Sequence, residues 1–372
     1  MEIPFYRSEI GGDDRDKLDD VLDGNIDDAV EDLESEFASY VGASYALSTS
    51  NGTAALHLAM LAIDLKRGDK VLCSVNAFPA IPEVVRHFDA EPIFVDIDEE
   101  TFNIDLNKLE AYLEDNDSKK LKAVIVSHIA GQSIDLERLY HIAQIYNVKI
   151  VEDACNALGA TFNGEKIGST GADITCFNFS PHLKKSVCNG GMMVTNDEDI
   201  MERARLLRSH AMVANESGLD YIYDVVDIGS KYTMSQLDAA FFSGQVAKCD
   251  EDIERQKEIA ARYNERLKGV LHVSLPIVQQ DHIFSLYVIK IDKNRDSFAR
   301  VLLEHGITTG LHYIPLHLMS YYKAKYALRI NDFPVALRNY QQILSLPIYA
   351  AMSDEEVEYV CDKVIEVAKT RV

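Results

Sequence analysis

The stretch LERLYHIAQIYNVKIVEDA, residues 136–154, joins an amphipathic segment directly to an apolar run that ends in two acidic residues. Its first part carries apolar side chains at helical spacing, and KIVEDA has the pattern of a buried strand. The same alternation recurs along the chain, with strand-like runs at 70–75, 92–98 and 123–128 and helical patterns at 18–41 and 53–63. Since strands alternate with helices, we expect an α/β fold with a mostly parallel central sheet covered by helices.

The pattern changes near residue 245. Residues 243–270 predict one long, charged helix, and a smaller mixed region follows, with strand signals at 285–291 and a turn at 306–313. We therefore predict a large α/β domain over residues 1–245 and a small α+β domain over residues 246–372.

The composition excludes some classes of function. The 372 residues include 37 basic and 60 acidic side chains, a formal charge of -23, which repels nucleic acid and anionic lipid surfaces. The N-terminus has no signal-peptide pattern and no apolar run reaches the roughly 18 residues that span a bilayer, so we expect a cytoplasmic protein. Its six cysteines form no CxxC pair, which indicates neither a metal site nor a disulfide framework.

A candidate anion site lies in STSNGTAALHLAM, residues 48–60, where a strand end meets a helix. Gly52 and Thr53 leave backbone N–H groups at the helix N-terminus, where the helix dipole favours a phosphate. The alternative is an ordinary strand-to-helix turn with Thr53 as the N-cap.

A second candidate follows the strand at 149–154, which delivers Glu152 and Asp153 to its carboxyl end. Ligands of doubly wound sheets bind at that edge, and a carboxylate there can keep a heterocyclic nitrogen protonated. The alternative is that Asp153 caps the next helix.

The third candidate is the segment FNFSPHLKKSVCNGG, residues 177–191, which contains Lys184 and Lys185. It follows a predicted strand at 172–179 and precedes another at 192–197. A lysine near a phosphate site and an acidic strand end is placed to form a Schiff base with an aldehyde cofactor. Taken alone, two adjacent lysines are more typical of a solvated loop.

Together these motifs resemble the DegT/StrS group of sugar aminotransferases, which use pyridoxal phosphate (PLP). The resemblance covers nearly the whole chain and includes IPFYRSEIGGDD (3–14), VEDACNALGATFNGEKIGSTGADITCFNF (151–179), KYTMSQLDAAFFSGQV (231–246) and LEHGITTGLHYIPLH (303–317). It implies the PLP-dependent transferase fold type I and a homodimer with shared active sites. It also implies amino transfer from glutamate to a keto carbon of a nucleotide-linked sugar, as in polysaccharide biosynthesis.

The resemblance also implies roles for single residues. Gly52 and Thr53 match the phosphate-binding turn, Phe78 the aromatic ring that stacks on the cofactor, and Asp153 the acid that pairs with the ring nitrogen. Asn156 stands where the family commonly has Gln or His beside the ring oxygen. Asn178 stands where the family usually has a phosphate-binding serine, a task that Ser180 can share, and Lys231 stands where the family commonly has an asparagine that reaches the partner subunit's phosphate site. His312, Tyr313 and His317 match a segment that lines the sugar-nucleotide end.

The reactive lysine departs from the family pattern. The usual position, six residues after Phe177, is Leu183. We favour Lys184 over Lys185 as the catalytic residue, because a loop and a long side chain tolerate a shift of one position. A third interpretation is that no lysine bonds the cofactor. A related dehydratase chemistry based on His182, or a non-catalytic family member, then becomes the alternative function.

Overall fold

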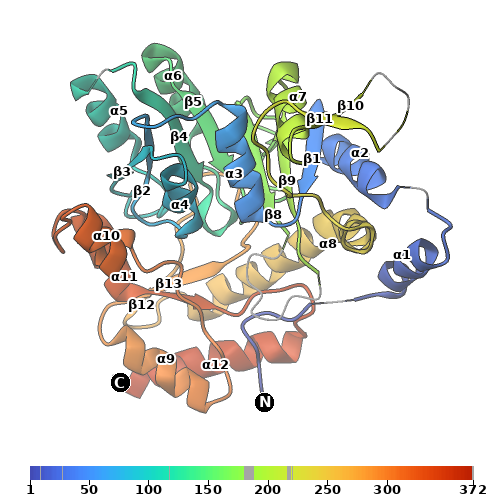
Figure 1. Ribbon diagram of the computed structural model, residues 1–372. Coiled ribbons are helices and arrows are strands. Elements are labelled where there is room, and N and C mark those ends of the chain that lie inside the picture. Colours follow the sequence, from blue (N-terminus) through green and yellow to red (C-terminus); the bar gives the residue numbers. More distant parts are fainter. Residues whose placement is uncertain are drawn as a thin grey trace.

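The computed structural model describes residues 1–8, 10–26, 28–116, 118–179, 188–215, 219 and 221–370. Its centre is a seven-stranded sheet in the order β1-β9-β8-β5-β4-β2-β3 (Figure 1). Strand bounds, in sheet order, are β1 Tyr45–Thr49, β9 Gly191–Thr195, β8 Ile174–Asn178, β5 Lys149–Asp153, β4 Leu121–Ser127, β2 Lys70–Ser74 and β3 Glu91–Val95. All neighbouring pairs are parallel except those that β9 makes with β1 and β8. The predicted α/β architecture is therefore observed.

Helices cover both faces of this sheet, because its strands are apolar on both sides. One face carries α3 (Gly52–Ala62), α4 (Ala80–Arg86) and α7 (Glu198–Leu207). The other carries α2 (Ala29–Val41), α5 (Leu106–Asp115), α6 (Leu136–Tyr146) and the start of α8 (Gln236–Leu267). The carboxyl ends of β4 and β5 reach the same edge of the sheet, where polar residues that end these strands come together.

A second layer lies at that edge (Figure 1). It is a three-stranded antiparallel sheet of β12 (Val273–Ser274), β13 (Tyr287–Ile291) and β14 (Ile343–Leu346). The second half of α8, α9 (Arg295–Glu304) and α12 (Asp354–Thr370) share its apolar core. The predicted domain division at residues 245 and 246 falls inside the continuous helix α8 and stays a prediction.

The remaining elements are short and connect or flank the two layers. They are α1 (Gly12–Leu22), α10 (Ser320–Lys325), α11 (Pro334–Gln342), the hairpins β6 (Thr161–Phe162)–β7 (Glu165–Lys166) and β10 (Met212–Ala214)–β11 (Tyr223–Val225), and 3-10 turns at Ile129–Gly131 and Leu316–Leu318. In the part of the chain that the structure describes, no helix combines the length and apolarity needed to cross a bilayer.

One expected element is divided. The helical pattern over residues 18–41 belongs to two helices, because Gly24 adopts a left-handed φ of 76° just after α1 ends. The second helix then begins at Asp28, whose carboxylate accepts hydrogen bonds from the backbone N–H groups of Val30 and Glu31. Apolar periodicity alone does not detect such a break.

Candidate active site

The largest part of the candidate site is a cavity of about 980 Å³ at the carboxyl edge of the central sheet. We call it the main cavity. The residues that line it come from the N-terminal segment, α3, the start of α4 and the loop before it, the ends of β5 and β8, and the turn after α9: Pro4, Phe5, Tyr6, Ser8, Gly52, Thr53, Leu56, Phe78, Ala80, Ile81, Asp153, Cys155, Asn178 and 308–313. Its size is in the range of pockets that hold small-molecule ligands.

The predicted phosphate turn borders the main cavity. Asn51, not Thr53, caps α3, because its side chain accepts a hydrogen bond of 2.9 Å from the Ala54 N–H. The N–H groups of the first helical turn, at Gly52 and Thr53, have no partner within the helix. A Cβ at residue 52 would lie 2.4 Å from the Asn178 Cβ, so only glycine permits this approach of α3 to β8. The turn can therefore present backbone donors to an anion.

Asp153 ends β5 and faces the main cavity, whereas its neighbour Glu152 does not. Consecutive strand residues point to opposite faces of the sheet. Glu152 is fully buried, where its carboxylate accepts hydrogen bonds from the Tyr140 hydroxyl at 2.7 Å and the Thr175 hydroxyl at 3.1 Å. Of the two predicted carboxylates, only Asp153 is available to a ligand in this cavity.

Two donors hold the Asp153 carboxylate. The Ser127 hydroxyl donates to Oδ2 at 3.3 Å, and the Cys155 backbone N–H donates to Oδ1 at 3.3 Å. Burial raises the pKa of Asp153, while hydrogen bonds from Cys155, the electrostatic contribution of His128 and the Ser127 hydrogen bond oppose that rise. Sequence reasoning missed Ser127, although it too is a polar residue at the end of an apolar strand.

Phe78 and Tyr313 form an aromatic corner of the main cavity. The Phe78 side chain is 56% exposed, which is unusual for such a residue beside a large apolar core. Its ring meets the Tyr313 ring edge-on, with centroids 6.2 Å apart. The Tyr313 N–H donates to Asn76 Oδ1 at 3.1 Å, and this bond fixes the backbone of the corner. A flat ligand ring can pack on the exposed face of Phe78.

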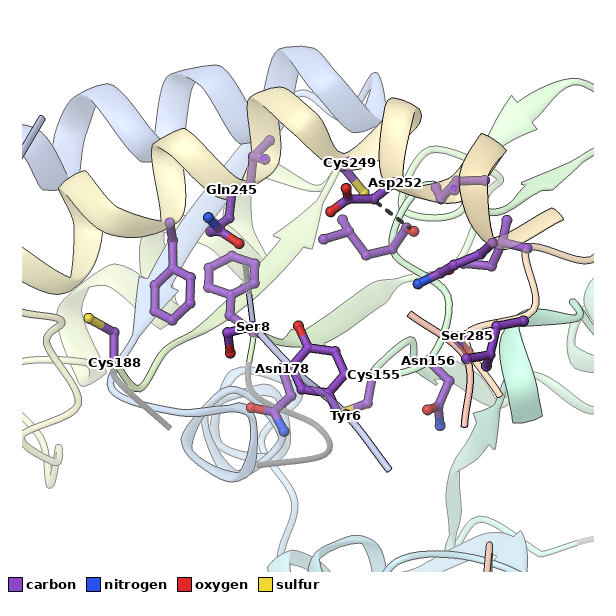
Figure 2. A pocket seen from close by; sticks show the side chains of 18 of the residues that line it. Tyr6, Ser8, Cys155, Asn156, Asn178, Cys188, Gln245, Cys249, Asp252 and Ser285 are labelled. Carbon is purple, nitrogen blue, oxygen red and sulfur yellow. Dashed lines mark hydrogen bonds between the residues drawn. The ribbon is translucent and has the colours of Figure 1, made fainter. Parts of the chain in front are cut away.

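A smaller cavity of about 200 Å³ adjoins the main one. Figure 2 shows α8 along one side of it, with Gln245, Cys249 and Asp252 projecting from that helix. The two cavities share the residues Tyr6, Ser8, Cys155 and Asn178. Asn156 lines the smaller cavity but not the main one. Sequence reasoning assigned no role to Tyr6 or Ser8, because nothing local links residues 4–8 to strands far along the chain.

The remaining predicted residues are dispersed. His312 lines the main cavity, stacks on Phe5 with centroids 5.5 Å apart, and lies with Nδ1 2.9 Å from the Ser345 hydroxyl. His317 is fully buried elsewhere, with Nε2 3.2 Å from the Ile330 carbonyl oxygen. Lys231 is exposed and forms a β-bridge with Ser209. The segment with Ser180, His182, Leu183, Lys184 and Lys185 lies outside the described residues.

Comparison of the sequence with known proteins identifies a family. Residues 9–365 match the DegT/DnrJ/EryC1/StrS aminotransferase family, which confirms the resemblance seen in the sequence. The chain is 35% identical over 353 residues to the spore coat polysaccharide biosynthesis protein SpsC of Bacillus subtilis, covering 91% of this chain and 90% of SpsC. It is 35% identical to the dTDP-3-amino-3,6-dideoxy-alpha-D-galactopyranose transaminase of Aneurinibacillus thermoaerophilus, covering 92% and 90% of the two chains.

A solved structure supports the fold. The putative sugar aminotransferase Spr1654 of Streptococcus pneumoniae, in its PMP form, superposes with a TM-score of 0.91 over 100% of both chains, at 23% identity. Together with the mostly parallel sheet, this likeness confirms the predicted transferase fold.

Proposed function

Because the chain belongs to the DegT/DnrJ/EryC1/StrS aminotransferase family, we propose that it is a PLP-dependent enzyme that aminates a keto carbon of a nucleotide-linked sugar at the expense of glutamate. The observation that carries this proposal is that one cavity holds a phosphate turn at Gly52 and Thr53, an exposed aromatic face at Phe78 and the carboxylate of Asp153. These are the three contacts that a phosphorylated pyridine ring needs.

The residues fit pyridoxal phosphate. The turn at Gly52 and Thr53 borders the main cavity with backbone N–H groups that have no partner within the helix, so a phosphate in the cavity can accept hydrogen bonds from them. Asp153 is buried and accepts two hydrogen bonds, which favour its ionised form against the opposing effect of burial. When bound, the protonated pyridine ring supplies an electron sink for the carbanion formed as the substrate loses its proton.

Three residues of the chain would hold this ring. The Asp153 carboxylate would keep a proton on the ring nitrogen, and the Ser127 hydroxyl, which donates to Asp153 Oδ2, fixes the direction of that carboxylate. Phe78 would pack against the face of the ring. Lys184, which we propose as the residue that bonds the cofactor, would be released as a free amine when the amino group of glutamate takes its place, and this amine would then move a proton at the substrate carbon.

The main cavity, at about 980 Å³, lies at the upper end of the sizes of small-molecule pockets, so it has room for a substrate beside the cofactor. The Aneurinibacillus relative is named for a dTDP-linked amino sugar, which supports a nucleotide-linked substrate here. We place the sugar-nucleotide end along the turn that carries His312 and Tyr313. His317 is buried away from the lining residues, so its predicted role as a substrate contact receives no support from its position.

We also propose a homodimer with shared sites. The β10–β11 hairpin and the chain after it expose Tyr221 at 77%, Tyr223 at 56% and Ile228 at 86%, all within ten residues of Lys231 in the sequence. Exposed apolar surfaces are typical of protein interfaces. Lys231 then contacts the phosphate bound by the partner. A cytoplasmic location is part of the same proposal, since all six cysteines are free thiols.

The test uses the purified protein with added PLP. Glutamate labelled with nitrogen-15 should give 2-oxoglutarate and the amine form of the cofactor, and a nucleotide-linked keto-sugar should then gain the label. Loss of a sugar oxygen without nitrogen transfer would instead indicate the dehydratase alternative based on His182, which the named relatives do not favour. Borohydride reduction followed by peptide mapping should locate the cofactor on Lys184. Label on Lys185, or bound PLP without label, contradicts that assignment.

A further inference from the structure

Asn156 and Tyr313 form a polar pair beside the main cavity. The Asn156 Nδ2 donates a hydrogen bond of 3.3 Å to the Tyr313 hydroxyl oxygen. The Asn156 side chain is 6% exposed, and its Oδ1 atom is buried with no hydrogen-bond partner among the described residues. This amide lines only the smaller cavity, whereas the Tyr313 side chain lines the main cavity, so a ligand in the main cavity meets Tyr313 rather than Asn156.

The Tyr313 hydroxyl can still donate a hydrogen bond. A phenol can accept a hydrogen bond and donate one. Its oxygen accepts from Asn156, and among the described residues its own proton has no acceptor. The same side chain lines the main cavity, so a ligand there can receive that proton in a hydrogen bond. Burial, and to a lesser extent the charge on Asp153, raises the pKa of Tyr313, so the phenol stays protonated at neutral pH.

We propose that Tyr313 is a further cofactor-positioning residue, whose hydroxyl donates a hydrogen bond to the ring oxygen of pyridoxal phosphate while Asn156 holds that hydroxyl in place. This inference rests on the function proposed above. It assigns to Tyr313 the contact that the sequence resemblance implies for Asn156, and it takes Tyr313 out of the purely substrate-binding group.

The chemistry of the ring favours this assignment. In the function proposed above, Gly52 and Thr53 would bind the phosphate and Asp153 the ring nitrogen, which leaves the ring oxygen as the polar ring substituent still to be assigned a partner in this cavity. In the pyridine ring, a single carbon lies between the nitrogen and the carbon that bears the ring oxygen. A donor to that oxygen must therefore lie close to Asp153. Tyr313 meets this condition, because it shares the cavity with Asp153 and is electrostatically coupled to it.

The test compares Tyr313→Phe with the unchanged protein by absorbance titration and by fluorescence measurement of the PLP dissociation constant, both without substrate. Removing the Tyr313 hydroxyl leaves the ring oxygen more negative. The ring oxygen then stabilises a proton bound close to it more strongly, and a higher pH is needed to remove that proton. We expect the pH midpoint of the visible absorbance to rise by about one unit, and the dissociation constant to rise about tenfold, the size of one charge-assisted hydrogen bond.

Two further variants make the test specific. Asn156→Ala should shift the midpoint in the same direction by a smaller amount, because Tyr313 then loses only the group that holds it. Tyr359→Phe is the matched control, since its hydroxyl bonds the His305 carbonyl oxygen in the other layer, and it should match the unchanged protein.

Three results would contradict the proposed role of Tyr313. If Tyr313→Phe raises only the KM for the sugar substrate, with midpoint and dissociation constant unchanged, the hydroxyl serves the substrate and the proposal fails. If Asn156→Ala shifts the midpoint while Tyr313→Phe does not, Asn156 itself contacts the cofactor and the proposal fails. If the unchanged protein binds no PLP at all, it is the proposed function that fails, and this inference fails with it.

Discussion

Replacing Gly244 with alanine tests how helix α1 is attached to the rest of the molecule. Gly244 lies inside α8, where alanine normally stabilises a helix by about 1 kcal/mol relative to glycine. Here the added Cβ would lie 2.4 Å from Oδ1 of Asp14, which is the buried residue of α1. The carboxylate cannot move aside easily, because its Oδ2 accepts hydrogen bonds from the Gly11 N–H at 2.7 Å and from Lys248 Nζ at 2.5 Å.

The net effect of Gly244→Ala on stability is the difference between the cost of the added carbon and the gain in helix propensity. Forcing an extra carbon into a packed site typically costs 1–3 kcal/mol, and the doubly held carboxylate argues for about 3 kcal/mol. Lys248 is 30% exposed on its side chain and can turn to water, so the cost stays below that of breaking a fully buried ion pair. After the helix-propensity gain of about 1 kcal/mol, Gly244→Ala should destabilise the protein by about 2 kcal/mol.

A double-mutant cycle separates the two effects. In an Asp14→Ala background the carboxylate is gone, so Gly244→Ala should recover its stabilising sign, and the coupling energy should be about 3 kcal/mol. Urea denaturation monitored by circular dichroism gives all four values. Gly12→Ala is the control, because a Cβ there meets nothing within 4 Å. A stabilising effect of Gly244→Ala alone, or a coupling energy near zero, refutes the reasoning.

Three other changes test the candidate site. Asp153→Asn keeps the shape but removes the charge, so PLP should remain bound in a spectroscopic assay while transamination falls by orders of magnitude; near-normal turnover would mean that Asp153 has no electronic role. Gly52→Ala should weaken PLP binding in a fluorescence titration, because its Cβ forces α3 away from Asn178; unchanged affinity would contradict the phosphate turn. Mixed dimers of Lys184→Ala and Lys231→Ala subunits should regain activity, and their failure to do so, once confirmed as mixed, would argue against shared sites.

The central sheet was predictable because its pattern is local. Apolar runs of strand length, such as residues 123–128 and 149–154, specify buried parallel strands by themselves, and the helices between them specify crossovers. The separation of α1 from α2 was not predictable in this way. It depends on the left-handed turn at Gly24 and on the cap at Asp28, and both interrupt an apolar pattern that continues on either side.

The part of the site that ends a strand was equally accessible from sequence. Asp153 reaches the cavity because it is the last residue of β5, and the alternation of a strand turns Glu152 to the other face. The N-terminal segment was not accessible. Tyr6 and Ser8 line both cavities because Ile3 pairs with Ile307 in a β-bridge, and no local pattern indicates a partner three hundred residues away.

For Asn156, the sequence and the three-dimensional packing give different parts of the answer. The family resemblance predicts that Asn156 lies beside the ring oxygen of the cofactor, and the structure places it on the wall of the smaller cavity, next to the main one. Tyr313, 157 positions away, accepts a hydrogen bond from the Asn156 amide and lines the main cavity, whereas Asn156 lines only the smaller one. On this packing we propose that Tyr313 makes the contact with the ring oxygen. The sequence therefore indicates the end of the sheet at which a side chain lies, whereas the packing of a distant turn determines which side chain lines the cavity there.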